Sequence, residues 1–517
     1  MKSFAAARAL NPVLGLLARR RLNQWLGNLT QGRLQKTQES ILLSHCKTAA
    51  ETEFGQAHGF AKVKTYADFK RATPLRPYAG FEPYIQRMRQ GERDILWPGL
   101  ISYYGQSSGT SATAAQNKFL PISKEQIVWQ QKAAFDVIAQ YLRLSKDRGF
   151  VGGYNLGLFP PSVLKSEGNG VFTGSNPGIM FRELPALARP MAIPKPSVRD
   201  ILDYNQKLQA IAENYWDYDV HAISGTSCWF SIFFDKLLAH RGVRTIQEIW
   251  PNLRVLFGGG VNANPYRRLI NERVGRDIIL MDNYNATEGG LFSVTDHLED
   301  RALLMIPDRG VFFEFVPREK HGRDDAPRLA LWEVQPGVDY SIVLTTSSGL
   351  FAYYIGDFVR FNSVYPHRME FVGRPSGVLS LTQELTTYVE IEKAVAKAQS
   401  QFSCSIVEYC VGPEVGVDAS GKGRYQFFFE FEKRPMDLNL FMTAIDDELK
   451  IQNRVYREHR LSDVAILPPV SHKLLSGSVQ KIMDRLGFRS VQSKFPRIID
   501  QQKCDLVTQF INKEQVS

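Results

Sequence analysis

The sequence predicts an α/β protein with a large N-terminal domain and a smaller α+β C-terminal domain. Strand-like runs alternate with helical patterns in the first half, a strand-rich block follows between Gly310 and Phe361, and the pattern changes again after Arg374. Alternating elements are typical of α/β folds, and the later strands indicate an attached β subdomain. A chain of 517 residues is also too long for a single core. We therefore predict domains at 1–374 and 375–517.

Apolar periodicity and Gly/Pro punctuation predict the elements in order. In the N-terminal part we expect a helix over 1–50, a short helix over 66–71, a strand over 100–104, a helix over 124–144, helices over 200–250, and strands over 254–257 and 278–281. Further strands are expected at 311–316, 329–334, 341–345 and 358–361. The C-terminal part is expected to contain a helix over 390–398, a hairpin of strands 405–411 and 425–431, and then helix, strand and helix.

Composition restricts the class of partner. Hydrophobic residues make up 44% and charged residues 22%, an ordinary globular balance. The net charge of +10 suits anionic ligands such as nucleotides and carboxylates, and is also compatible with nucleic acid or acidic lipid. The sequence contains no run of five basic residues, so we expect no nucleic-acid partner. No apolar run is long enough for a transmembrane segment. The protein is expected to be a monomer.

The cysteines and histidines indicate neither a disulfide-stabilised protein nor a zinc protein. The five cysteines are scattered without a CxxC pair, and the nine histidines lack metal-ligand spacing. This pattern argues against a disulfide framework and against a zinc site. A reducing, cytoplasmic location is expected.

The N-terminus has two interpretations. Residues 1–26 contain four arginines and no acid, and they resemble a mitochondrial presequence. The alternative is a first helix that packs on its own domain. Its buried stripe would then comprise Leu10, Val13, Leu14, Leu17 and Leu22. We favour packing because the helical pattern continues to Cys46.

A small-residue loop between Ser107 and Lys118 is the first candidate site. Ser107, Ser108, Gly109, Thr110 and Ser111 stand in this loop. Small residues allow backbone N–H groups to surround an anion, hydroxyl groups add donors, and Lys118 adds a positive charge. The loop is expected to follow a strand and precede a helix, as phosphate loops do, although its spacing is not that of a Walker loop. A flexible linker would have the same composition.

Two further motifs follow predicted strands. The first contains Tyr284, Asn285, Ala286, Thr287, Glu288 and Gly289. Thr287 could donate to phosphate, Glu288 could hold Mg²⁺, and Tyr284 could stack on a purine; the alternative is a polar helix start. The second motif places Asp357 beside Gly356, where a carboxylate could accept from two ribose hydroxyls. Its alternative is an Asp-stabilised turn.

The order of these motifs, followed by Gly373-Arg374, resembles the adenylate-forming superfamily. More closely, the chain resembles the acyl-acid amido synthetases of the plant auxin-responsive (Gretchen Hagen) family and their bacterial relatives. The segments that carry this resemblance are Thr52–Gly55, Leu96–Gly99, Ser107–Ser111, Ile249–Leu253, Gly259–Asn262, Pro265–Arg267, Tyr284–Gly289, Phe312–Pro317, Gly349–Arg360 and Gln492–Arg497.

The sequence departs from the family pattern in three places. The phosphate loop is two residues longer and carries Thr113 where glycine is common. Thr287 replaces a serine. Gln383-Glu384 stands where relatives show Gly-Glu. The longer loop puts the reach of Lys118 to the phosphates in doubt.

The resemblance implies an ATP- and Mg²⁺-dependent ligase that converts a carboxylic acid to an acyl-adenylate and transfers the acyl group to an amine, expected to be an amino acid. The implied nucleotide-binding residues are Ser107, Ser108, Gly109, Thr110, Ser111, Lys118, Gly259, Gly260, Tyr284, Asn285, Ala286, Thr287 and Asp357, with Glu288 on the metal. The implied catalytic residues are Lys494, Thr287 and Arg374, the last at the hinge of a mobile C-terminal domain. Two alternatives remain open: coenzyme A or a carrier thiol as acceptor, and a catalytically silent nucleotide-binding regulator.

The acid pocket is the least defined part of the sequence prediction. The 221–235 segment, with Cys228, Trp229, Phe230, Phe233 and Phe234, and the Phe312 strand could line it. Such aromatic residues lie more often in a core than in a pocket.

Overall fold

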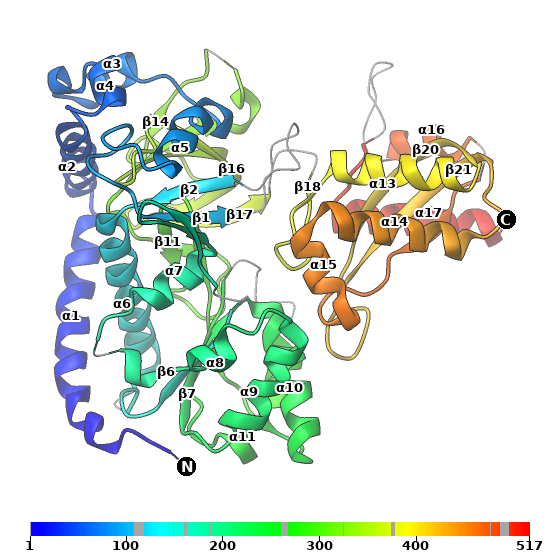
Figure 1. The fold of residues 1–517 in the computed structure, drawn as a ribbon, viewed down its shortest axis with the longest axis horizontal. Coiled ribbons are helices and arrows are strands. Elements are labelled where there is room, and N and C mark those ends of the chain that lie inside the picture. Colours follow the sequence, from blue (N-terminus) through cyan, green and yellow to red (C-terminus); the bar gives the residue numbers. More distant parts are fainter. Residues whose placement is uncertain are drawn as a thin grey trace.

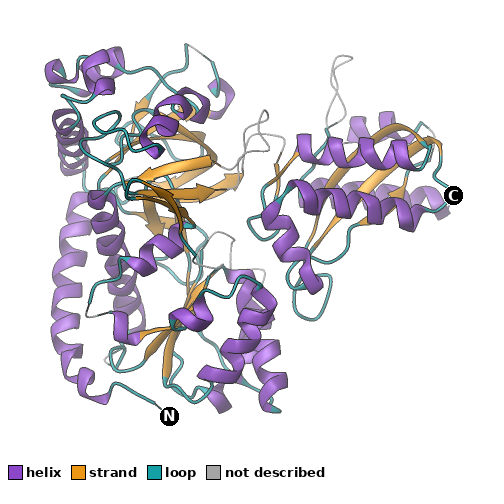
Figure 2. Cartoon of the chain, viewed as in Figure 1, coloured by secondary structure: helices purple, strands orange, loops and turns teal. Residues whose placement is uncertain are grey.

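The computed structural model describes residues 2–107, 118–147, 149–159, 163–186, 188–259, 267–323, 325–373, 378–475, 477–485 and 496–516. A large α/β body and a smaller domain after Val378 are visible in Figures 1 and 2. One hydrophobic cluster of the smaller domain draws all its members from Leu379 onward, so this domain has its own core. The predicted fold class is therefore confirmed. Among the described helices, none combines the length and apolar composition that a bilayer crossing requires.

The chain begins with a helical layer. It comprises η1 (Ala5–Leu10), α1 (Asn11–Asn28), α2 (Arg33–Thr48), α3 (Glu53–Ala57), η2 (Phe60–Lys62), α4 (Tyr66–Ala72), η3 (Tyr78–Gly80) and α5 (Glu82–Arg89). The predicted single helix over 1–50 is interrupted at 29–32, where Gly32 has φ 81°. Helix α4 lies where the sequence predicted it.

Helix α1 packs on its own domain, as predicted, but of the predicted stripe only Leu22 is buried. It lies against α6 (Lys124–Ser145) and buries Ala18, Leu22 and Trp25. The predicted stripe residues Leu10, Val13 and Leu17 are 56%, 54% and 49% exposed. Polar contacts decide which face of α1 turns inward. The Trp25 indole N–H donates to Met305 O (2.7 Å), and Arg21 is buried on the same face.

Arg21 is the centre of a buried ion-pair network. Its guanidinium donates to both carboxylate oxygens of Asp136 on α6, at 2.6 and 2.9 Å, and to both of Asp308, at 2.6 and 2.7 Å. Arg309 also donates to Asp136, at 2.7 and 2.8 Å. The Arg21 side chain is 7% exposed and that of Asp136 is fully buried. The pKa of Asp308 is lowered because hydrogen bonding and charge from Arg21 outweigh burial, the largest single influence. The network therefore joins α1, α6 and the loop before Val311.

A five-stranded parallel sheet forms the second layer, in the order β6-β3-β7-β8-β9. Its strands are β3 (Tyr154–Leu158), β6 (Ala192–Ile193), β7 (Val220–Gly225), β8 (Val255–Phe257) and β9 (Ile279–Met281). The helices that lie between β3 and β9 in the chain are α7 (Asn176–Arg182), η4 (Arg189–Met191), α8 (Pro196–Arg199), α9 (Tyr204–Tyr215), α10 (Ser227–Arg241), α11 (Ile246–Ile249) and α12 (Arg267–Val274). The prediction of helix throughout 200–250 was wrong at β7. This short strand lies between two helices in the chain, and it is a central strand because it pairs with β3 and β8.

Two antiparallel or mixed sheets complete the large domain. The first has the order β2-β1-β5-β4, with β1 (Tyr103–Ser107), β2 (Lys118–Ile122), β4 (Lys165–Gly168) and β5 (Val171–Gly174). The second has the order β10-β11-β12-β17-β16-β15-β13-β14. Its members are β10 (Asn283–Ala286), β11 (Gly290–Val294), β12 (Leu303–Met305), β13 (Val311–Pro317), β14 (Leu329–Ala330), β15 (Asp339–Thr346), β16 (Tyr353–Ser363) and β17 (Arg368–Gly373), with η6 (Arg318–Lys320) after β13. The expected strand over 329–334 extends only to Ala330.

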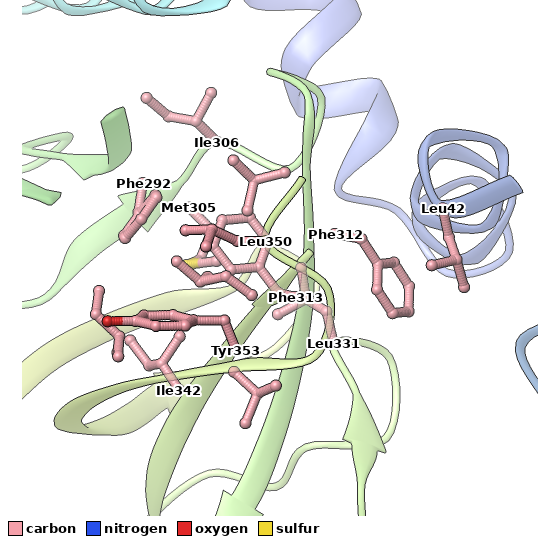
Figure 3. Close-up of a cluster of buried hydrophobic side chains, with 14 of the residues drawn as sticks. Leu42, Phe292, Met305, Ile306, Phe312, Phe313, Leu331, Ile342, Leu350 and Tyr353 are labelled. Atoms are coloured by element: carbon pink, nitrogen blue, oxygen red, sulfur yellow. The ribbon is translucent and has the colours of Figure 1, made fainter. Parts of the chain in front are cut away.

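Aromatic residues form the core between the large antiparallel sheet and the helical layer. Figure 3 shows Phe312 of β13 directed toward Leu42 of α2, and Phe313 on the other face of the strand. The Phe313 ring meets Phe292 edge-on at 5.3 Å. Phe312 contacts Tyr66 and Trp332 and is fully buried, so the suggestion that its strand lines the acid pocket was wrong for this side chain.

The C-terminal domain has a three-stranded sheet, β20-β21-β22, with the predicted hairpin at β20 and β21. Its elements are β18 (Val378–Leu379), β19 (Thr386–Thr387), α13 (Tyr388–Gln401), β20 (Ser405–Glu414), β21 (Arg424–Lys433), α14 (Leu438–Gln452), α15 (Arg454–Arg460), η7 (Leu461–Asp463), β22 (Val470–Lys473), α16 (Ser478–Arg485) and α17 (Gln501–Val516).

Candidate active site

The candidate site lies at the carboxyl edge of the parallel sheet. Strand β7 is followed by Thr226 and Ser227, β8 by Gly258 and Gly259, and β9 by Asp282. The strand order reverses between β3 and β7, because the chain goes from β3 to β6 on one side and returns to β7 on the other. Open α/β sheets bind ligands at the carboxyl ends of their strands beside such a reversal.

The β10–β11 hairpin is fastened to this edge by Asn283. The Asn283 amide donates to Gly258 O and its oxygen accepts from Asn285 Nδ2 at 2.6 Å. A Cβ on Gly259 would lie 2.8 Å from Asn283 Oδ1 and 2.9 Å from Asn285 Nδ2. A side chain at Gly259 would therefore collide with Asn283 and Asn285, and the role of Gly259 in binding the nucleotide stays a prediction.

A hydrogen bond joins the second and third predicted motifs. The Tyr284 hydroxyl donates to Asp357 Oδ2 at 2.7 Å, although the two residues lie on β10 and β16. Asp357 is 4% exposed and lies within β16, where the pairing with β15 shifts register and Gly356 has φ 88°. The alternative of an Asp-stabilised turn was therefore wrong: Asp357 lies in a β-bulge, which redirects a side chain out of a strand.

The turn between β10 and β11 carries Thr287 and Glu288, so the alternative of a helix start was wrong here. A Cβ on Gly105 of β1 would lie 2.3 Å from Thr287 Cγ2, so the absence of a side chain at Gly105 admits this turn. Gln126 Nε2 donates to Thr287 O at 3.2 Å. Glu288 is 8% exposed and accepts from the Tyr353 hydroxyl at 3.4 Å. Ala286 O accepts from Gly289 N at 3.2 Å and closes the turn.

The strands on either side of the small-residue loop pair antiparallel. Ser107 ends β1 and pairs with Lys118 at the start of antiparallel β2, and helix α6 begins only at Lys124. The predicted strand before the loop and the predicted helix from residue 124 are both present, but strand β2, which the sequence did not predict, lies between the loop and that helix because Lys118–Ile122 pairs with β1. Lys118 Nζ lies 5.6 Å from the Tyr78 ring centroid. Ser108, Gly109, Thr110 and Ser111 lie outside the described residues.

The C-terminal domain contacts the large domain beside β7. Thr226 Oγ1 donates to Gln383 Oε1 at 3.4 Å, and the Trp229 ring meets His459 edge-on at 5.1 Å. Gln383 has φ 78°, in the left-handed region that favours glycine, which explains why glycine is expected at this position. Non-glycine residues held in this region concentrate at functional sites.

A second group of contacts secures the same interface on α10. Ser231 Oγ donates to Ser420 O at 2.9 Å, and Ser420 Oγ donates to Asp235 Oδ2 at 2.5 Å. Arg273 bridges Asp235 (2.5 Å) and Ala419 O (2.9 Å). Burial lowers the pKa of His459 to about 3, so its ring is neutral at this interface.

Sequence reasoning missed several residues at this edge. Gln126 and Tyr353 donate hydrogen bonds to Thr287 and Glu288 in the turn between β10 and β11. Ser227 is fully buried, with its hydroxyl beside Gly258. Lys207 is 1% exposed, donates to Phe159 O after β3 at 2.9 Å, and burial lowers its pKa to about 8. None of these four residues belongs to a local motif. Lys207 could still have been noticed in the sequence, because it is a lysine within the apolar pattern of α9.

The aromatic residues suggested for the acid pocket are core residues in this structure. Trp229 is 2% exposed, and Phe230, Phe233 and Phe234 are fully buried in the core of the parallel sheet. The Cys228 side chain, Gly260, Arg374 and Lys494 lie outside the described residues. The roles suggested for Gly260, Arg374 and Lys494 stay predictions.

The carboxylate chemistry of the site suits Mg²⁺ held through phosphates. Within the described ranges, no group of three or more His, Cys, Asp or Glu side chains could hold a metal ion. Mg²⁺ in nucleotide sites needs only one or two carboxylates, because waters and phosphate oxygens complete its shell. Glu288, at the turn between β10 and β11, fits that requirement.

Sequence comparison identifies the family. The GH3 family N-terminal domain matches residues 26–210, the central domain matches 304–374, and the C-terminal domain matches 389–503. The chain belongs to the GH3 family. The predicted resemblance is thereby confirmed, over most of the chain.

Named relatives of the GH3 family show both partial and nearly complete alignments. A jasmonoyl–L-amino acid synthetase of Oryza sativa subsp. japonica is 27% identical over 277 residues, which is 49% of this chain and 47% of that protein. The chain thus spans about half the length of that first relative. A probable indole-3-acetic acid-amido synthetase of Arabidopsis thaliana is 23% identical over 90% of this chain and 89% of that protein.

Solved structures share the fold. A GH3.15 acyl acid amido synthetase in complex with 2,4-DB has a TM-score of 0.58 and 20% identity, and covers 94% of this chain and 95% of its own. A 2-hydroxyisobutyryl-CoA ligase has a TM-score of 0.54 and 13% identity, and covers 94% of both chains. These likenesses show that this GH3 family member has the fold of adenylate-forming ligases.

Proposed function

We propose that this protein is an ATP-dependent ligase that adenylates a carboxylic acid and transfers the acyl group to an amine, an amino acid. The observation that carries the proposal is the meeting of Asn283, Thr287, Glu288 and Asp357 at the carboxyl edge of the parallel sheet. Two relatives that align over nearly the whole chain support it: one is named a probable indole-3-acetic acid-amido synthetase and the other a jasmonoyl–L-amino acid synthetase.

In the first half-reaction a carboxylate oxygen of the acid attacks the α-phosphorus of ATP, and pyrophosphate leaves. Both reactants are anionic, so the site must neutralise charge and align the atoms. Thr110, Ser111 and Thr287 donate to phosphate oxygens in this proposal, and Asp357, oriented by Tyr284, accepts from the ribose hydroxyls. Glu288 would hold Mg²⁺, and the bound ion would supply positive charge against the phosphates.

In the second half-reaction the amine attacks the acyl carbon, loses a proton, and AMP leaves. We propose that domain 375–517 turns about Arg374 and Pro375 between the half-reactions and that Lys494 enters the site in one of them. Support comes from the contact of Gln383 with Thr226 at the end of β7, because it brings a turn of the C-terminal domain to the carboxyl edge of the parallel sheet. Closure of such domains excludes water that would hydrolyse the adenylate.

We further propose a cytoplasmic enzyme that acts on small molecules. Cys46, Cys404, Cys410 and Cys504 are free and buried, which suits a reducing compartment. The monomeric state stays an expectation.

Pyrophosphate exchange tests the first half-reaction. With ATP and Mg²⁺, labelled pyrophosphate is expected to enter ATP only when a carboxylic acid is added; indole-3-acetic and jasmonic acids are the first probes, taken from the relatives' names. Turnover with an amino acid should release AMP. Release of ADP and phosphate would contradict adenylation, and nucleotide binding without exchange across a broad panel of acids would favour the silent regulator. Thioester formation with coenzyme A in place of amide would identify the thiol acceptor.

Variants at the hinge are expected to affect the two half-reactions unequally. Replacing Pro375 with glycine, or Lys494 with alanine, should slow one half-reaction by about tenfold or more while ATP affinity changes little, because the ATP motifs precede the hinge. The measurements are pyrophosphate exchange and single-turnover amide formation from preformed adenylate. Lys503→Ala, at a half-exposed lysine of α17 paired with Asp500, is the matched control. Proportionate loss of both half-reactions in every variant would refute the alternating domain.

A further inference from the structure

Helix α1 exposes an apolar face that the ligase function leaves unexplained. Leu10, Val13, Leu16 and Leu17 are 56%, 54%, 69% and 49% exposed. Val13, Leu16, Leu17 and Arg20 are spaced i, i+3, i+4 and i+7, so they share one face of the helix. The buried residues Ala18, Leu22 and Trp25 hold the other face against α6, so the exposed face is fixed in place and is not a fraying end.

All charged side chains within residues 1–38 are basic. The sequence has no aspartate or glutamate before Glu39. Arg19 and Arg20 are exposed, and neither forms an ion pair with any residue in the described ranges. Arg33 and Lys36 are exposed at the start of α2, which continues along the same edge of the molecule in Figure 1.

We propose that this α1 face, defined as Leu10, Val13, Leu16, Leu17, Arg19 and Arg20, docks on the surface of an anionic lipid bilayer. A helix with exposed leucines among arginines lies in the headgroup region, where its apolar side chains reach the acyl boundary and its cations meet lipid phosphates. A second copy of the chain is a poorer occupant, because two such faces would bring arginines against arginines. The helix is too polar to cross a membrane, so it lies on the surface.

The position of α1 is compatible with the ligase reaction. Figure 1 shows α1 on the flank of the large domain opposite the C-terminal domain. Docking through α1 therefore leaves the candidate active site and the C-terminal domain away from the bilayer. The proposal does not depend on the ligase activity.

Vesicle sedimentation tests the proposal with the full chain. At low salt the protein is expected to sediment with vesicles of phosphatidylcholine and phosphatidylglycerol and not with phosphatidylcholine alone. Leu16→Gln/Leu17→Gln and Arg19→Gln/Arg20→Gln should each reduce the bound fraction by about tenfold. The matched control is Leu440→Gln/Leu506→Gln, at leucines 56% and 47% exposed on α14 and α17, which should bind as the parent does.

Four outcomes would overturn the proposal. The first is no sedimentation with anionic vesicles, the second is equal binding to neutral vesicles, and the third is an equal loss of binding in the control variant. The fourth is a dimer, detected by sedimentation velocity, that dissociates in Leu16→Gln/Leu17→Gln, since the face would then be an interface between copies. Unchanged circular dichroism melting and unchanged pyrophosphate exchange show that a variant's loss of binding is not a loss of fold.

Discussion

Replacement of Asp357 with alanine is expected to weaken ATP binding by roughly 10²–10⁴-fold while the protein stays folded. If the carboxylate accepts from both ribose hydroxyls, two charge-assisted hydrogen bonds are lost, each worth about 1.5–3 kcal/mol. The β-bulge at Gly356 and the hydrogen bond from Tyr284 hold the carboxylate in place. Calorimetric titration with ATP measures the change.

A carboxylate on the neighbouring strand gives the matched control. Asp339 lies on β15 and pairs with Arg318 and Arg360 at 3.2 and 2.6 Å. Asp339→Ala should leave ATP affinity unchanged, whereas Tyr284→Phe should weaken it less than Asp357→Ala does, because only the orienting hydroxyl is removed. ATP affinity that is the same in Asp357→Ala as in the parent protein would refute the assignment to ribose.

Replacement of Arg21 with methionine is expected to lower the free energy of unfolding by about 3–5 kcal/mol. The change leaves the buried carboxylate of Asp308 without its arginine and removes one of the two arginines of Asp136. That loss is a large fraction of the roughly 5–15 kcal/mol that stabilises a typical domain. Urea unfolding followed by circular dichroism measures it.

Arg87 provides an exposed counterpart with the same connectivity. It bridges two carboxylates, Glu53 at 2.9 Å and Glu92 at 2.8 Å, but its side chain is 40% exposed. Water screens such pairs, so Arg87→Met should shift the unfolding midpoint far less than Arg21→Met. If both variants shifted the unfolding midpoint equally, burial of the Arg21 ion pairs would not increase their contribution to stability.

Short-range patterns in the sequence predicted much of the fold. The helices at α4, α6 and α13 and the strands β8, β9, β13 and β20 lie where periodicity placed them. These elements could be predicted because each buries one regular face or follows a clear Gly or Pro boundary. The motif at 284–289 and the residue Asp357 could be proposed as nucleotide-binding for the same reason: their chemistry is local and their order in the chain is distinctive.

Elements whose character depends on distant partners were predicted less well. Strand β7 is short and flanked by helices, and only its pairing with β3 and β8 makes it a central strand. The loop after Ser107 leads into β2, because Lys118–Ile122 pairs with β1 before α6 starts. The rotation of α1 is set by Asp136 and Asp308, which lie more than a hundred residues from Arg21 in the chain.

By itself, the sequence determined the family, the two-domain α/β class and the residues that could handle a nucleotide, because these reside in motifs of a few neighbouring residues. Only the tertiary structure decided that Tyr284 meets Asp357, that Gly105 makes room for Thr287, and that Gln383 lies beside Thr226. Such contacts join strands and domains far apart in the chain. Their geometry follows from sheet register and domain packing, which no local pattern encodes.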